Sequence, residues 1–215
     1  MGRLRITASF LCILLLLSAC GTPTQRYGAS KSEGVYFTVP NNWHEISTKS
    51  LNAQEALSKA LGAAEKLALV KWQDAFSADA VYGAKAVFTF TATNKPVAFA
   101  RVRSLFPDEV NAVSYNALRN VIVPLTDWVN NPTKSTPIFN ILDDREVVQK
   151  GARGVRTVYS VEVAGQSLTV DQTSLVSQDR QKIYVFIVRC SSVCYDKNKS
   201  VITKVADSFT VRGTR

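Results

Sequence analysis

A single histidine limits the catalytic chemistry open to this chain. His44 is the only histidine among 215 residues, so a Ser-His-Asp or Cys-His mechanism would have to use it as general base. It directly follows Trp43, and no Gly-x-Ser-x-Gly sequence occurs that would place a nucleophilic serine at a strand-to-helix turn. We therefore expect His44 to lie exposed in a loop and predict a protein without catalytic residues.

Two further segments resemble ligand sites only in part. Asp143, Asp144 and Glu146 carry oxygens that hard cations prefer, but the segment lacks the glycine and terminal glutamate of a calcium-binding loop. We expect a solvated turn there. Residues 151–154 (GARG) have no following Lys-Ser or Lys-Thr pair and do not fit a phosphate-binding loop. The sequence thus predicts neither a metal site nor a cofactor.

The first 19 residues have the parts of a bacterial secretion signal. Arg3 and Arg5 precede an apolar run over residues 10–17, which is too short to span a membrane permanently. The sequence Leu-Ser-Ala-Cys that ends at Cys20 resembles the lipobox of bacterial lipoproteins. This resemblance implies that Cys20 carries lipid and holds the protein on the extracytoplasmic face of a bacterial membrane. The alternative is an ordinary cleaved signal with a free Cys20.

The two cysteines of the expected domain predict a disulfide. Cys190 and Cys194 lie in the sequence CSSVC near the C-terminus. In an exported protein such a pair forms a disulfide more readily than a metal site, because a metal would need further ligands and only His44 is available. We expect the disulfide to pin a strand to the helix that follows, with two buried thiols as the alternative.

The charge is strongly basic, with 26 lysines and arginines against 17 acidic residues. Such an excess often indicates a polyanion, but an exported protein leaves the compartment of nucleic acids, so we predict no nucleic-acid partner. Anionic lipid headgroups and wall polymers are alternatives, as is charge that only keeps the protein soluble. Lys150, Arg153 and Arg156 form a cluster that could face an anion or be a solvated strand edge.

The chain divides into a tether and one domain. Residues 20–34, the lipidated cysteine and a polar segment of small residues, predict a flexible tether, and residues 35–212 a single domain. Strands are expected over residues 35–39, 85–93 and 96–105. A helix is expected over residues 52–68, because apolar residues recur there at helical spacing: Leu57, Ala60, Leu61, Ala64, Leu67 and Ala68.

The second half of the domain predicts a meander of strands. A helix over residues 115–129 comes first, and Pro124 must kink or end it. The strands follow, over residues 155–163, 168–176 and 183–188; the last is apolar on both faces and should be covered on both sides. A short helix after Cys194 and a final strand over residues 208–211 close the chain. The pattern predicts an α+β fold, a mainly antiparallel sheet flanked by helices in an α/β/α sandwich.

Both ends of the domain resemble those of PsbP-like domains. The resemblance rests on VYFTVP at residues 35–40 with Trp43, and on VADSFTV at residues 205–211. It covers about residues 34–212 and implies an α/β/α fold like that of mycobacterial LpqN-type lipoproteins, with Trp43 in the core. For Trp72 and Trp128 the sequence does not decide between packing in the core and binding a ligand. The resemblance also implies a non-catalytic binding or assembly role, although no functional residue can be transferred because the matching positions belong to the core.

These observations favour a membrane-anchored, non-enzymatic binding or accessory protein of the cell envelope. Its partner would be an envelope protein, a lipid or a wall component within reach of the membrane. Two alternatives remain, a hydrolase or transferase acting on envelope material and a carrier of a small ligand between sheet and helix. A pocket that holds His44 beside a carboxylate and a hydroxyl would favour the enzyme, whereas an apolar groove would favour binding.

Overall fold

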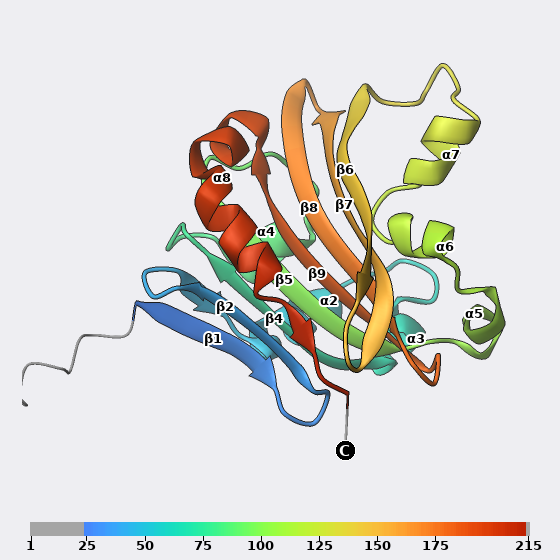
Figure 1. Cartoon of the computed structure of the whole chain (residues 1–215). Coiled ribbons are helices and arrows are strands. Elements are labelled where there is room, and N and C mark those ends of the chain that lie inside the picture. Colours follow the sequence, from blue (N-terminus) through green and yellow to red (C-terminus); the bar gives the residue numbers. More distant parts are fainter. Residues whose placement is uncertain (1–23, 214–215) are drawn as a thin grey trace, which may run out of the picture.

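The computed structural model describes residues 24–213 of the chain (Figure 1). The expected signal over residues 1–19 and the expected lipid site at Cys20 lie outside the described residues. Within residues 24–213, no helix is both long enough and apolar enough to cross a membrane.

Seven antiparallel strands form the main sheet, in the spatial order β3-β4-β5-β9-β8-β7-β6. The expected meander is present, because β7, β8 and β9 pair consecutively through tight turns. Along β9 the side chains of residues 183–188 are all buried and alternate between the two faces of the sheet, which confirms that this strand is covered on both sides. The strands are β3 (His44–Ile46), β4 (Val70–Ser77), β5 (Val97–Ser104), β6 (Phe139–Val148), β7 (Ala152–Val163), β8 (Gln166–Ser177) and β9 (Lys182–Ser191).

One face of the main sheet is covered by the helix α8 (Ser192–Asp207) and by a second, three-stranded sheet. That sheet contains β1 (Gln25–Ser30), β2 (Val35–Pro40) and β10 (Thr210–Val211), with β2 in the centre. Alternate residues of β2 point inward, so that Phe37 packs against rings of the main sheet, with its centroid 4.7 Å from that of Phe186 and 5.7 Å from that of Phe76. Trp43, only 4% exposed, lies in the same core, as expected.

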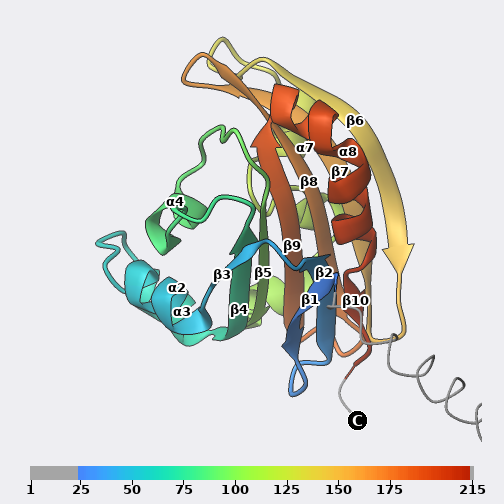
Figure 2. The same ribbon diagram turned by 90° about the vertical axis from the view of Figure 1, so that its left-hand side faces the viewer.

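Six short helices cover the opposite face (Figures 1 and 2). Figure 2 shows α2, α3 and α4 beside the β3–β5 end of the sheet, and Figure 1 shows α5, α6 and α7 on the side away from α8. The fold is therefore α+β, a mainly antiparallel sheet flanked by helices, as the sequence predicts. The helices are α2 (Thr48–Glu55), α3 (Ala63–Ala68), α4 (Ala84–Phe88), α5 (Pro107–Ala112), α6 (Tyr115–Arg119) and α7 (Leu125–Asn130).

The expected helix over residues 52–68 is wrong. Its place is taken by α2, which begins after the N-cap Ser47, and by α3, with a break at residues 57–62 between them. Gly62 has a φ of 74°, a left-handed conformation that ends any continuous helix there. Leu57 and Leu61, members of the apolar stripe, are exposed.

The expected strand over residues 85–93 is also wrong, because α4 occupies residues 84–88 and the chain after it is irregular. The single helix over residues 115–129 is two helices, α6 and α7, with Pro124 as the N-cap residue of the second. The helix is therefore interrupted, as expected, but the first segment already ends at its C-cap Asn120, and Pro124 lies at the start of the second.

The folded part of the chain begins earlier than the sequence predicts. Residues 25–30, expected to be part of a flexible tether, form strand β1 and pair with β2 along its whole length. Gly28 faces the Phe37 ring so closely that a Cβ atom would lie 2.1 Å from it, which explains a glycine inside this strand. The expected tether is therefore wrong for residues 25–30.

The disulfide between Cys190 and Cys194 is formed, with 5.9 Å between the two Cα atoms. It joins the end of β9 to the first turn of α8, where Ser191 caps the helix by accepting a hydrogen bond from the Cys194 N–H. Both cysteines are buried. The disulfide thus fixes the junction between strand and helix, the role expected for it.

Candidate functional site

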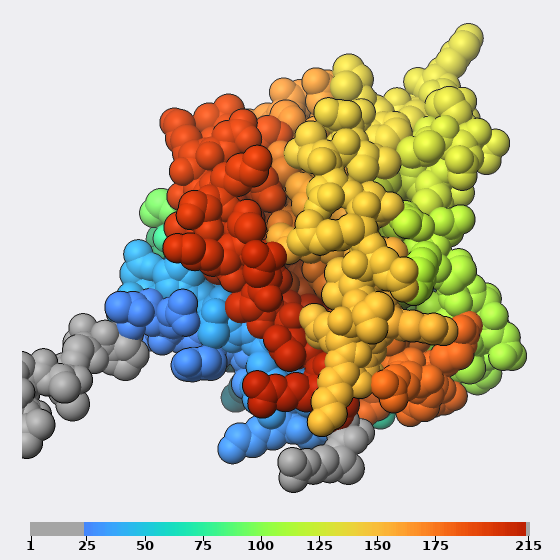
Figure 3. All heavy atoms as spheres, in the orientation of Figure 1, coloured from blue at the N-terminus to red at the C-terminus, as the bar shows by residue number. Residues whose placement is uncertain are grey.

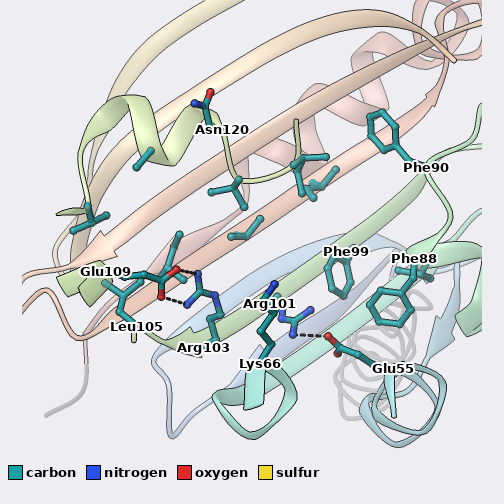
Figure 4. A pocket seen from close by; sticks show the side chains of 18 of the residues that line it. Glu55, Lys66, Phe88, Phe90, Phe99, Arg101, Arg103, Leu105, Glu109 and Asn120 are labelled. Carbon is teal, nitrogen blue, oxygen red and sulfur yellow. Dashed lines mark hydrogen bonds and ion pairs between the residues drawn. The ribbon is translucent and has the colours of Figure 1, made fainter. Parts of the chain in front are cut away.

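An apolar groove of about 680 Å³ lies on the helix-covered face of the main sheet (Figure 4). This volume falls within the range of small-molecule sites. Strands β5 and β9 form its floor, α4 and the segment after it form one wall, and α5, α6 and residues 121–122 form the other. The apolar lining residues are Val87, Phe88, Phe90, Val97, Phe99, Leu105, Phe106, Ala112, Val113, Ala117, Val121, Ile122, Ile183, Val185 and Ile187.

The floor of the groove follows from the two-residue period of its strands. Every second residue of β5 and of β9 points toward the helices, and these residues form cross-strand pairs. The pairs change in character along the groove, from pairs with an arginine of β5 to an apolar pair and then to a pair with Arg189 of β9. In order they are Arg103 with Ile183, Arg101 with Val185, Phe99 with Ile187, and Val97 with Arg189.

The charged end of the groove contains two ion pairs. The Arg103 guanidinium donates to both carboxylate oxygens of Glu109, at 2.6 and 2.7 Å, and Glu109 also accepts from the Phe106 N–H. The hydrogen bonds from Arg103 hold the pKa of Glu109 below its usual range. Arg101 donates through Nη2 to Glu55 at 2.7 Å (Figure 4). Both carboxylates are thus already bound to arginines.

A third cation, Lys66 of α3, lines the same end of the groove and is exposed. It forms no ion pair with any residue in the described part of the chain. Its positive charge helps to lower the pKa of Glu109, which places it near the Arg103–Glu109 pair (Figure 4). This end therefore has three cations against two carboxylates.

At the other end, the buried guanidinium of Arg189 shapes the wall. It donates to the backbone carbonyls of Ala86, Val87, Thr89 and Thr91, at 2.8 to 3.1 Å. Burial lowers the pKa of Arg189 from its ordinary value. These carbonyls have no strand or continuing helix to bind them, so Arg189 supplies the donors that hold this segment over the groove.

Aromatic rings from α4 and the following segment close over the apolar part. Phe88, 38% exposed, meets Phe99 edge to face with ring centroids 5.8 Å apart. Phe90 lies under the Arg189 guanidinium, 5.9 Å from the ring centroid. The wall formed by α4 and the segment after it is thus attached to the sheet through a few side chains.

His44 does not belong to this groove. It is exposed, as expected, but it begins the short strand β3 instead of lying in a loop, and its Cα is paired with that of Ser77. The undecided tryptophans are both partly buried: Trp72 packs against the core under α8, and Trp128 against the core under the short helices.

The expected basic cluster is not a single surface. Arg156 is buried and donates from Nε and Nη2 to the two carboxylate oxygens of Asp171, both at 2.7 Å, and from Nη1 to Asp207 of α8. Arg153 is exposed and lies near Tyr115, on the other face. Residues three apart in a strand point to opposite faces, so Arg153 and Arg156 lie on different faces of β7, and Lys150 lies in the turn before this strand. Figure 3 shows the C-terminal residues, in red, beside the yellow surface of β6.

The acidic segment is part of strand β6, so the expected turn is wrong. Each carboxylate has its own protein partner: Asp144 binds Arg119, Glu146 accepts from the Tyr115 hydroxyl, and Asp143 pairs with Arg145. Among residues 24–213, no group of three or more His, Cys, Asp or Glu side chains is placed to hold a metal ion.

No protein-family model matches the chain, and no curated protein matches its sequence. Solved structures are similar to it at low identity. Cyanobacterial PsbP from Synechocystis is 15% identical, with a TM-score of 0.49 over 90% of this chain and 95% of that one. LpqN of Mycobacterium tuberculosis, described as involved in cell envelope biogenesis, is 12% identical, with a TM-score of 0.46 over 86% and 89%.

The Ran-binding protein Mog1p of Saccharomyces cerevisiae is 10% identical, with a TM-score of 0.46 over 88% of this chain and 96% of that one. At these values the similarities assign no activity and no partner to this chain.

Proposed function

We propose that this protein is a non-enzymatic binding module that holds a small, largely apolar ligand in the groove between β5, β9 and the short helices. The observation that carries the proposal is the lining of the groove: aliphatic and aromatic side chains for most of its length, with polar groups gathered at its ends. Such a distribution is typical of sites that bind by burial and orient the ligand through a few polar groups.

The groups in the groove are poorly suited to catalysis. Among the described residues that line it there is no histidine, cysteine, serine or threonine. The two carboxylates, Glu55 and Glu109, are bound to arginines. The lowered pKa of Glu109 keeps it ionised and makes it a weak base, the opposite of a carboxyl tuned for proton transfer. The hydrolase or transferase alternative therefore has no machinery in this groove.

We further propose that the protein acts in the cell envelope, anchored on the extracytoplasmic face of a bacterial membrane through lipid on Cys20. The support is the signal-like segment of residues 1–19 and its lipobox-like end. The Cys190–Cys194 disulfide is compatible with an oxidising compartment.

The groove is tested with N-phenyl-1-naphthylamine, a neutral apolar dye that fluoresces when buried. We expect saturable binding by the wild type and at least about tenfold weaker binding by Ala117→Trp, because a bulky ring on α6 would fill the groove. The matched control is Ala53→Trp, at an exposed alanine of α2 outside the groove, which should bind like the wild type. No saturable binding, or equal loss in both variants, would contradict the proposal.

A further inference from the structure

We infer that the ligand of the groove is a single-chain anionic amphiphile, whose apolar chain lies over β5 and β9 and whose anionic head binds at Lys66, Arg101 and Arg103. This inference rests on the proposed binding function and names the class of ligand. Three observations support it: the order of side chains along the groove, the excess of positive charge at one end, and donors there that no protein group uses.

The order of side chains matches a molecule with one charged and one apolar end. The lining residues of β5 run from Arg103 and Arg101 to Phe99 and Val97, and the facing residues of β9 are aliphatic until Arg189. The seven residues from Val97 to Arg103 span ~20 Å of strand. An extended alkyl chain that starts at the arginines would therefore cover the apolar floor that includes Phe99 and lie beneath Phe88.

Arg189 at the far end does not offer a second head site. Both of its terminal nitrogens donate to backbone carbonyls, those of Ala86, Val87, Thr89 and Thr91, and the Phe90 ring covers its guanidinium. The two ends of the groove thus differ, although both contain arginine. Only the Lys66 end retains cations that can bind a ligand. The charged head of the ligand would therefore lie at this end and its apolar chain would extend toward Arg189.

The excess charge at the Lys66 end selects an anion. Glu55 and Glu109 form close ion pairs with Arg101 and Arg103, whereas the exposed Lys66 makes no close ion pair among the described residues and acts on Glu109 only from a distance. Arg101 is bound to Glu55 only through Nη2, so its Nη1 has no acceptor in the described part of the chain. A carboxylate or phosphate head could accept from both groups. A neutral head would gain less, and a cationic head would be repelled.

The test measures displacement of the neutral dye by three ligands with the same chain: decanoate, decanol and decyltrimethylammonium, each below its micelle concentration. We expect decanoate to bind at least about tenfold more tightly than either of the others. Among octanoate, decanoate and dodecanoate, affinity should rise by up to about fourfold per methylene, the factor that corresponds to ~0.8 kcal/mol. As a control, circular dichroism is used to check that the protein stays folded with each ligand.

The variant Lys66→Gln removes the cation that has no counterion. It should weaken decanoate about fivefold at low ionic strength and less at high salt, and leave decanol and the dye unchanged. Lys59→Gln, at an exposed lysine outside the groove, has the same net charge and should bind decanoate like the wild type.

Dye binding together with equal affinity for decanoate, decanol and decyltrimethylammonium would overturn the anionic head and leave the groove function standing. Equal effects of Lys66→Gln and Lys59→Gln would assign any preference for anions to overall charge, and would also overturn the inference. Absence of dye binding would remove the proposed function itself.

Discussion

Asp74 is an unusual residue for the inside of a strand. It lies in β4, is only 8% exposed, and its carboxylate accepts a hydrogen bond from the Ala75 N–H at 2.9 Å. Burial, with a smaller contribution from the negative charge of Glu45, raises its pKa from 3.8 to about 7. In the folded protein this carboxyl therefore titrates near neutral pH, although it lies outside the groove.

The raised pKa of Asp74 predicts that stability falls as pH rises. Between about pH 4 and pH 7 the folded state binds one proton more than the unfolded state, so the free energy of unfolding decreases with pH, by up to about 4 kcal/mol in total. Asp74→Asn should remove this part of the dependence. Urea unfolding of both proteins at pH 5 and pH 8 checks it, and parallel pH dependences would show that Asp74 is not responsible.

At the scale of elements, the sequence predicts strands well where apolar and polar residues alternate or where an apolar run is continuous. It predicts them poorly where residues far apart in the sequence decide the conformation. The strands β7, β8 and β9 follow from their alternating or continuous apolar runs. Strand β4 is missed because Gln73 and Asp74, two polar residues, are buried in it. The stripe with Leu57 and Leu61 has a helical period but no surface to pack on, and periodicity cannot report whether such a surface exists.

Of the candidate site, only the part of the groove floor that β5 forms can be predicted from the sequence. Val97, Phe99, Arg101 and Arg103 share a face of an expected strand, which gives the change from apolar to basic. The pairing of that strand with β9, and the position of Glu109, depend on tertiary structure. Residues 85–93 are rich in β-formers, yet Arg189, about a hundred residues later, holds them in another conformation.

Arg189 should therefore control the order of one wall of the groove. In Arg189→Met the backbone carbonyls of Ala86, Val87, Thr89 and Thr91 lose the hydrogen bonds that Arg189 donates. We expect hydrogen exchange, compared with the wild type, to increase more over residues 84–92 than elsewhere, with a loss of about 2–4 kcal/mol in stability. Exchange measured by mass spectrometry checks this. Arg153→Met, at an exposed arginine of β7, is the control, and a similar response in both would contradict the assignment.

At the scale of the whole molecule, the two faces of the sheet have different character. The face under α8 and the small sheet is a closed core with stacked rings such as Phe186 and Phe209, whose centroids are 4.8 Å apart. The opposite face is covered by short helices and contains the groove. Six short helices leave gaps that one long helix would fill, so binding is expected on the side with the weaker cover.

Anchoring of the whole protein is predicted to depend on Cys20. Cys20→Ser should release the protein from the membrane or leave it unprocessed, because lipid on this residue would be its anchor. Partitioning into a detergent phase compares the variant with the wild type. Cys12→Ala, which removes a cysteine from the expected signal, should partition like the wild type. Partitioning of Cys20→Ser into the detergent phase as complete as that of the wild type would disprove the lipid anchor.

The early start of β1 has a consequence for where such an anchored protein can work. Its pairing with β2 begins at Gln25, only five residues after Cys20. Five residues span at most ~18 Å when fully extended. A lipid at Cys20 would therefore confine the domain to a thin shell next to the bilayer surface and restrict its tumbling. Amphiphiles that leave the outer lipid layer would meet the groove at high local concentration, and partners farther away would remain out of reach.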